Sequence, residues 1–199
     1  MRLHIVAAAY RQPIAVRGFI DSLVLQSYKN WMAYIVHDGP PEADYKEIIE
    51  NDSVFTKDPR IGFYHSETRV GHNGHVNRRD WLDAIIGAPD DYVLMTNCDN
   101  YYVPYFMDIM LKEAFRDVGV VYCDFASHHV NYEYFKSTMK LSGIDLGAFI
   151  VRLDVAQKVR FTHVDYLPAD GLYAEECAAY CNANKLRIMP VRKPIFIHN

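Results

Sequence analysis

The chain has 199 residues, of which 50% are hydrophobic, and a formal net charge of −4. This length fits one domain with a full core, so we expect residues 1–199 to form a single domain, either a small enzyme or one domain of a longer protein. The weak negative charge excludes electrostatic binding to nucleic acid or to an acidic membrane surface. No apolar run approaches the length of a membrane span.

The cysteines argue against a structural zinc knuckle. The chain has four of them, with no Cys-x-x-Cys pair among Cys98, Cys123, Cys177 and Cys181. The chain opens without the apolar leader of a secreted protein, so we expect reduced thiols and a cytoplasmic location.

Short apolar runs alternate with amphipathic ones from the start of the chain. The stretch 2–10, RLHIVAAAY, lacks polar alternation and predicts a strand that is buried on both faces. Pro13 opens a predicted helix with one apolar stripe, formed by Val16, Phe19, Ile20 and Leu23. Further strands are predicted over 31–37, 61–66, 91–97, 118–125 and 147–153, with short extended segments over 186–191 and 194–198. Further helices are predicted over 40–51, around 78–85, and over 104–115 and 169–183.

This alternation predicts an α/β fold with a mainly parallel central sheet flanked by helices. In such sheets, ligands bind beyond the carboxyl ends of the strands. Three predicted strands end in polar tips, at 7–12, 37–39 and 97–100, and we expect these tips to converge. Asp38 at the second tip suits hydrogen bonds from a nucleobase or a ribose hydroxyl, although an Asx-turn with the following amides is the alternative.

The opening forty residues resemble glycosyltransferases with the GT-A fold, especially those similar to family two. Those enzymes have a helix that ends Ser-Leu-x-x-Gln-(Ser/Thr)-Tyr and then a strand that ends Asp-Gly-Ser. The residues that match in order and spacing are Ser22, Leu23, Gln26, Ser27, Tyr28, Asp38 and Gly39, while Pro40 replaces the usual Ser. The resemblance implies transfer of a sugar from a nucleotide-diphosphate donor, UDP-linked, to a hydroxyl of a saccharide, lipid-linked or protein acceptor, with inversion.

The resemblance also implies a donor site and a metal. The stretch VLMTNCDNYYVP is similar to the family's Asp-x-Asp strand end, which holds a divalent cation against the donor's two phosphates; Asn97 replaces the first Asp. The implied ligands of Mn²⁺ or Mg²⁺ are Asp99 and, by its position near the end of the chain, His198. A capping turn and a solvated terminal histidine are the alternatives. The implied nucleotide-sugar contacts are Ala9, Tyr10, Arg11, Asp38, Arg78, Asn97 and Cys98.

Arg78 enters that set because Asn77-Arg78-Arg79 stands where the family has Ala-Arg-Asn at a helix start. An arginine there offers a bidentate fork to a diphosphate. We favour Arg78 over Arg79, and a solvated helix face is the alternative for either.

The acceptor side is implied by two later stretches. In DYLPADGLYAEECAAY, Asp170 matches the position of the catalytic base, with helix amides keeping it ionised and with Glu175 and Glu176 in reserve; an N-cap role is the alternative. In SGIDLGAFIVRLDVAQ, Asp145 and Gly147 frame the sugar. The polar, aromatic stretch 127–135, SHHVNYEYF, is a further candidate for acceptor contact, and a surface loop is the alternative for both of these last two stretches.

Two other functions share this layout. A sugar-phosphate nucleotidyltransferase needs a glycine-rich loop after its first strand, and AAAYRQP has no glycine. A non-catalytic nucleotide- or sugar-binding module stays open because Asn97 carries no charge. Donor hydrolysis or transfer with Mn²⁺ distinguishes an enzyme from such a module.

Overall fold

The structure is a computed structural model that describes residues 1–43, 45–47, 58–166 and 168–199. In chain order its elements are β1 (Leu3–Ala9), α1 (Pro13–Val24), β2 (Trp31–His37), β3 (Ile61–His65), η1 (His72–Gly74), α3 (His75–Ala84), β4 (Tyr92–Asn97), β5 (Tyr101–Tyr102), α4 (Phe106–Lys112), β6 (Val118–Ser127), η2 (His128–Val130), β7 (Glu133–Phe135), η3 (Leu146–Ala148), β8 (Phe149–Arg152), α5 (Leu153–Val159), α6 (Ala169–Ala183) and β9 (Arg187–His198).

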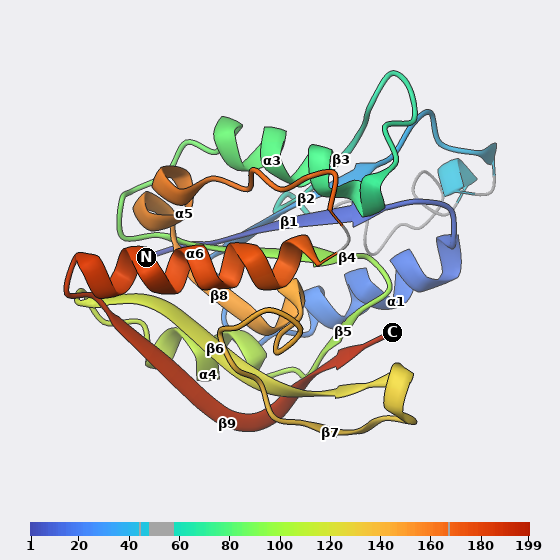
Figure 1. Cartoon of the computed structure of the whole chain (residues 1–199). Coiled ribbons are helices and arrows are strands. Elements are labelled where there is room, and N and C mark those ends of the chain that lie inside the picture. The colour runs from blue at the N-terminus through green and yellow to red at the C-terminus, as the bar shows by residue number, and fades with distance from the viewer. Residues whose placement is uncertain (44, 48–57, 167) are drawn as a thin grey trace.

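The strands form one twisted sheet in the order β3-β2-β1-β4-β8-β6-β9-β5, with β7 paired to β6 (Figure 1). The first four strands in that order are mutually parallel. Beyond them β8 runs antiparallel to both of its neighbours, while β9 is parallel to β6 and antiparallel to β5. The predicted α/β fold is confirmed, and its parallel part is the half that carries the polar tips.

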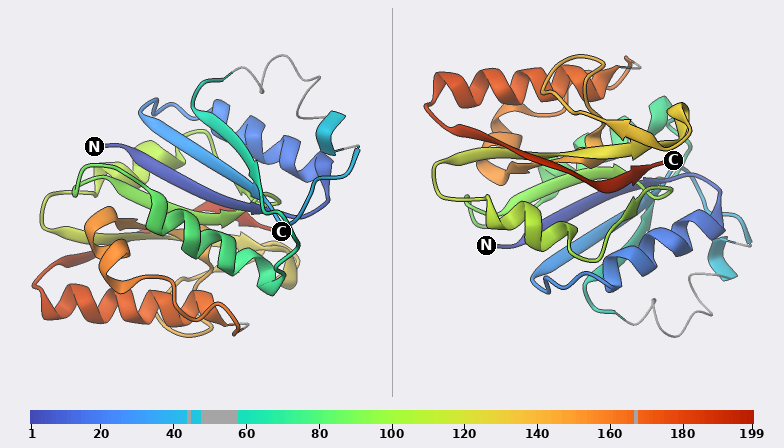
Figure 2. Two further views of the ribbon diagram at one scale, coloured as in Figure 1. Left: turned by 90° about the horizontal axis from the view of Figure 1, so that it is seen from above. Right: turned by 90° about the horizontal axis from the view of Figure 1, so that it is seen from below.

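Helices cover both faces of the sheet. Helices α3, α5 and α6 lie on one face, and α1 and α4 lie on the other (Figure 2). All seven residues of β1 are buried between the two layers, as the unbroken apolar run predicts. The predicted stripe of α1 is also buried, so this helix closes its face of the core.

The family motif at the end of α1 has a structural role. The buried Gln26 side chain donates to the carbonyls of Ser22 (2.9 Å) and Val103 (2.8 Å) and accepts from the Met107 N–H (3.1 Å). These bonds satisfy all but one of the lone pairs and protons of a buried amide, which is costly to leave unpaired. The glutamine therefore joins α1 to the turn between β5 and α4.

Two predicted boundaries are wrong. The segments 186–191 and 194–198 form one strand, β9, which bends past Pro190 and Pro194 through register shifts against β6. The predicted strand 147–153 begins as the short helix η3, and its last residue already belongs to α5. Of the predicted helix 40–51, residue 44 and residues 48–51 lie outside the described residues. In the described part of the chain, each helix is too short or too polar to cross a membrane.

Candidate active site

Two adjoining cavities open at the carboxyl ends of β1, β2 and β4. The first, of about 380 Å³, is lined by the strand tips 8–12, 38 and 97–99 and by the loop 69–74. The second, of about 290 Å³, lies beside it and shares Asn73 and Asn97 with it. The tips meet because the parallel register places Ala9 opposite His37 and Ala8 opposite Asn97. The expected convergence of the three tips is therefore present.

Asp38 is 5% exposed at the edge of the first cavity. Its two carboxylate oxygens accept hydrogen bonds from the backbone N–H groups of Val70 (2.8 Å) and Gly71 (2.9 Å). The Arg69 guanidinium lies 3.8 Å from the same carboxylate. Asp38 thus anchors the loop 69–74, which lines the first cavity, and does not cap the residues that follow it. Each of its carboxylate oxygens keeps one lone pair for a ligand.

The Tyr10 ring and two arginines in contact with it form the mouth of the first cavity. The guanidinium carbons of Arg69 and Arg11 lie 4.1 Å and 5.1 Å from the centre of the Tyr10 ring. Arg11 and Gln12 both have left-handed backbone angles, with φ of 54°. Such angles cost energy in residues other than glycine and concentrate at ligand sites.

His37, which the sequence did not single out, holds this mouth in place. Its Nδ1–H donates to the Gly39 carbonyl (2.9 Å), so its Nε2 accepts from the Arg11 N–H (3.2 Å). The ring is 1% exposed and joins the tips of β1 and β2.

Arg78 is buried, with 1% exposure, beneath the floor that the two cavities share. Its five N–H groups all have acceptors within the protein: Thr96 O twice, Asn73 O, His75 Nδ1 and Asn97 Oδ1. Each N–H already has an acceptor, so a bidentate contact with a diphosphate, which stays a prediction, requires that some of these bonds be exchanged. Arg79, the alternative, pairs with Asp80 on the surface.

The tip after β4 contributes to the floor of the first cavity. The Asn97 amide oxygen accepts from Arg78, and the Cys98 backbone N–H donates to Ala8 O at 2.9 Å. Burial raises the pKa of the Cys98 thiol well above its usual value. The thiol is therefore uncharged where it lines the first cavity. Burial also raises the pKa of Asp99, whose Oδ1 is buried and has no hydrogen-bond partner among the described residues.

Asp145 and His198 form a pair in the second cavity. The Asp145 carboxylate accepts from the Gly147 N–H (2.7 Å) and lies 3.2 Å from His198 Nε2. Burial raises the pKa of Asp145 to about 6. Gly147 lies behind this pair, outside both cavities, where a Cβ would come within 2.6 Å of the Phe196 ring. The contact of Gly147 with an acceptor sugar stays a prediction, while its N–H positions Asp145.

Asp170 faces the same cavity from the first turn of α6. Pro168, not Asp170, occupies the N-cap position of that helix, so the capping alternative does not hold. Oδ1 of Asp170 is buried without a hydrogen-bond partner among the described residues. Burial, followed by repulsion from Asp145, raises its pKa to about 7, because both effects outweigh Arg78, the Leu146 backbone N–H and His198, which favour the ionised form. That the helix amides keep Asp170 ionised stays a prediction.

The second cavity suits a divalent cation at its border with the first. Asp99 and Asp170 each present a buried oxygen without a partner, and His198 lies close enough to alter the pKa of both. Carboxylate oxygens with one imidazole are a donor set that Mn²⁺ accepts, and Mg²⁺ accepts the carboxylates. Asp99 and His198 are the residues that would hold such an ion, with the remaining positions left to a ligand.

Comparison with known proteins agrees with this geometry. The sequence model described as Glycosyl transferase family 2 matches residues 4–154, so the chain belongs to that family. The predicted GT-A fold is thereby confirmed, and solved structures support it.

Two of those structures are of longer chains, of which this chain matches a part. TarS residues 1–349 from S. aureus superposes with a TM-score of 0.75 at 16% identity, covering 100% of this chain and 60% of that one. The mannosyltransferase PcManGT from Pyrobaculum calidifontis, in complex with GDP-Man and Mn²⁺, has a TM-score of 0.72 at 13% identity, covering 99% of this chain and 56% of that one. At these identities the similarity shows a shared fold. A search of curated proteins by sequence finds no match to the chain.

Sequence reasoning missed several lining residues. The loop that carries Arg69, His72 and Asn73 closes the first cavity, and His75 and His129 line the second. Two weak signals were present: the Gly/His/Asn composition of 69–77 and the polar stretch 127–135. Glu175 and Glu176, the reserves for the base, line neither cavity.

Proposed function

We propose that the chain is a glycosyltransferase that moves a sugar from a UDP-linked donor to an acceptor hydroxyl with inversion, assisted by Mn²⁺ or Mg²⁺. The observation that carries this proposal is Asp170. A buried carboxylate with a free oxygen and a pKa raised to about 7 suits a general base near neutral pH. Asp170 lines the second cavity, which adjoins the first, and the first cavity suits a nucleotide.

In this proposal the first cavity binds the nucleotide. The lone pairs left on Asp38 accept from the base, Tyr10 offers a ring face, and Arg11 and Arg69 supply positive charge. TarS 1–349 has been solved in complex with UDP and with UDP-GlcNAc, which favours a uridine donor, whereas PcManGT holds GDP-Man. Ala9, Asn97 and Cys98 shape the cavity.

The donor's diphosphate belongs at the border of the two cavities, near Asp99 and His198. Asp99 and His198 would hold a divalent ion there, and its charge would offset the charge that develops on the departing diphosphate. Asn97 takes the place of a second carboxylate and brings no charge, and its oxygen is held by Arg78. We infer that Arg78 is a positioning residue, because it fixes Asn97 and adds buried positive charge beneath the site.

The acceptor hydroxyl enters the second cavity. Asp170 takes the proton of that hydroxyl as its oxygen bonds to the anomeric carbon and the bond from that carbon to the diphosphate breaks. Asp145, held by the Gly147 N–H, faces the same space and suits a hydrogen bond from a sugar hydroxyl. The acceptor is a saccharide, a lipid-linked sugar or a protein hydroxyl.

Two features of the whole protein are also proposals. A cytoplasmic location agrees with the free, buried state of all four cysteines. The chain spans 60% or less of the solved chains named above, so a single domain that acts alone is an expectation for the protein as a whole.

The test uses the untagged chain with UDP-GlcNAc, UDP-glucose and GDP-mannose in turn, each with Mn²⁺. We expect UDP release from one UDP-linked donor, loss of that release in EDTA, and a product of inverted anomeric configuration when an acceptor is supplied. Tight UDP binding without turnover under any condition would favour the non-catalytic module. A retained configuration would remove Asp170 from the role of base.

A further inference from the structure

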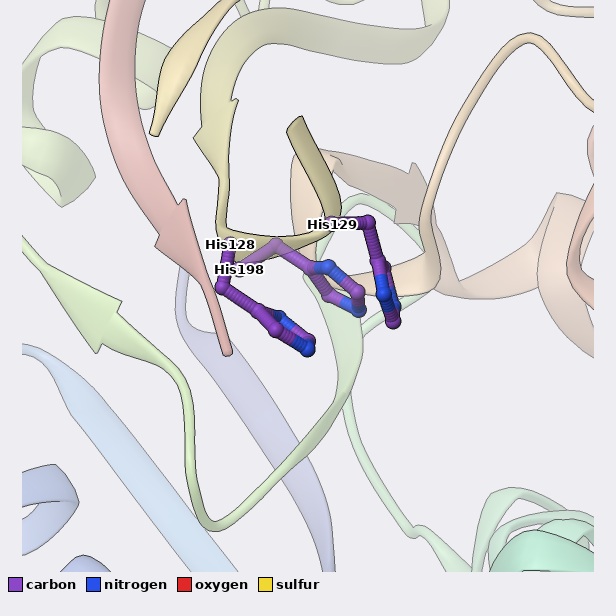
Figure 3. A group of neighbouring side chains, drawn as sticks. All are labelled: His128, His129 and His198. Carbon is purple, nitrogen blue, oxygen red and sulfur yellow. The ribbon is translucent and has the colours of Figure 1, made fainter. Parts of the chain in front are cut away.

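Three histidine side chains gather at the open side of the second cavity. His128 and His129 belong to η2, and His198 lies at the end of β9 (Figure 3). One ring nitrogen of each lies within 4.8 Å of the corresponding nitrogens of the other two. The ring centres of His128 and His129 are 3.8 Å apart, and those of His129 and His198 are 5.2 Å apart. Figure 3 shows the three rings side by side.

The fold, not the local sequence, creates this group. Strand β6 ends at Ser127, which is paired with His198 of β9. The chain then turns sharply through η2, where Asn131 and Tyr132 have left-handed φ angles of 53° and 60° before β7 begins. The turn therefore holds two exposed histidines beside a third that comes from 69 residues further along the chain.

We propose that His128, His129 and His198 bind a transition-metal ion of the Zn²⁺ type. Imidazole nitrogen suits Zn²⁺, Ni²⁺ and Cu²⁺ far better than it suits Mg²⁺. Tetrahedral zinc with Zn–N bonds of about 2.0–2.1 Å needs nitrogens roughly 3.3 Å apart. His128 and His129 are exposed, so rotation of their side chains closes the present gap. The fourth position stays open for water or an added ligand.

The surroundings of His198 support a ligand role. When its Nε2–H donates to Asp145, 3.2 Å away, the Nδ1 lone pair is available to a metal. The Ser127 hydroxyl lies 3.3 Å from Nδ1 and is a free rotor that can turn aside. All four thiols are buried, so they do not compete for the metal.

This site differs from the one proposed for Mn²⁺ or Mg²⁺ in its chemistry, because its ligands are nitrogens alone. The two sites share His198, so zinc on the three histidines withdraws that side chain from Asp99. The inference needs neither donor nor acceptor and does not rest on the proposed transfer reaction.

The experiment uses untagged protein, freed of metal with EDTA and then exchanged into clean buffer without nucleotide. Zn²⁺ is titrated by calorimetry, and Co²⁺ is titrated while its visible absorption is recorded. We expect one Zn²⁺ per chain, bound at least about 100-fold more tightly than Mn²⁺, and Co²⁺ bands typical of four coordination. His128→Asn and His129→Asn each weaken Zn²⁺ binding by at least about tenfold.

His65→Asn is the matched control, because His65 is an exposed histidine on β3 and lies outside both cavities. It should bind Zn²⁺ as the parent does. Because His128 and His129 are exposed in a surface turn, their variants should keep the parent's circular dichroism and melting temperature. Zn²⁺ affinity that is equal in the parent and in both variants overturns the proposal, and so does the absence of a Zn²⁺ site in the parent.

Discussion

The two cavities differ in how their acids are paired. Asp38 of the first cavity receives two backbone N–H groups. Asp170 of the second cavity and Asp99, which lines the first cavity near its border with the second, each bury an oxygen that has no partner among the described residues. Burial raises the pKa of both of these acids. Asp38 is thus a paired acid that shapes the first cavity, whereas Asp99 and Asp170, near the border of the two cavities and in the second, keep costly unpaired oxygens, which proteins retain where a ligand or reaction uses them.

This contrast leads to opposite expectations for substitutions. Neutralising a paired acid should weaken the fold and disturb the cavity that it shapes. Neutralising an unpaired acid should leave the fold intact and abolish the function that needed the charge. The predictions below test that contrast, beginning with the largest effect.

Asp170→Asn should reduce the rate of sugar transfer by roughly 10²–10⁴, because the amide cannot take the acceptor's proton. Binding of UDP should stay within about threefold of the parent, since the donor contacts lie in the other cavity. Steady-state transfer rates and calorimetry with UDP measure the two quantities. Glu175→Gln, an exposed change on the same helix, is the control and should transfer at the parent rate.

A variant that transfers at the parent rate would assign the base to another residue. A variant that loses UDP binding as well would place Asp170 in the donor site, and the contrast between the cavities would fail.

Asp99→Asn should weaken UDP binding in the presence of Mn²⁺ by roughly 10–100-fold, because it removes the only carboxylate of the described 97–100 tip. In EDTA, the parent and the variant should bind UDP equally weakly. Calorimetry under the two conditions makes the measurement. Asp90→Asn, at the opposite end of the same strand, is the control. Equal UDP affinity of the parent with and without Mn²⁺ contradicts the metal assignment.

Asp38→Asn should lower the free energy of unfolding by about 1–3 kcal/mol, because the new NH₂ group faces one of the two backbone N–H donors. UDP affinity should fall as the 69–74 loop loses its anchor. Urea denaturation and calorimetry measure these changes. Asp80→Asn, which alters a surface pair with Arg79, should change stability by less than about 1 kcal/mol. An unchanged UDP affinity in Asp38→Asn would show that Asp38 serves neither the nucleotide nor the loop.

The order of strands and helices and the meeting of the three tips could be predicted because they depend on local patterns. An apolar run without polar alternation implies a strand buried on both faces, and the parallel register then brings together whatever follows each strand. That reasoning placed Ala9, Asp38 and Asp99 around one cavity.

The partners of those residues could not be predicted, since they come from distant parts of the chain. Arg78 looked free at a helix start, yet Thr96 and Asn97 of β4 take three of its five N–H groups. Gly147 looked open, yet Phe196 of β9 lies against it. Because β9 contains prolines, the sequence predicted two short segments in place of the single strand that brings His198 to the site.

The smallest expected effect concerns stability and pH. The pKa of Asp170 is about 7 in the folded protein, above the usual value of 3.8. The folded state therefore holds its proton more tightly than the unfolded state between these values, and this contribution to stability is lost as the pH rises from about 4 to about 7. Asp170→Asn carries no such proton, so its stability should vary less over that range.

Without metal, Asp170→Asn should melt roughly 2–4 °C above the parent at pH 8, and the difference should shrink at pH 5. The gain corresponds to about 1 kcal/mol, since water entry and relaxation offset most of the cost of a buried charge. Thermal unfolding in EDTA at the two pH values measures it. Asp38→Asn, the comparison, should melt below the parent at both. If Asp170→Asn also melts below the parent at pH 8, the Asp170 carboxylate is paired in solution and the contrast between the two cavities is wrong.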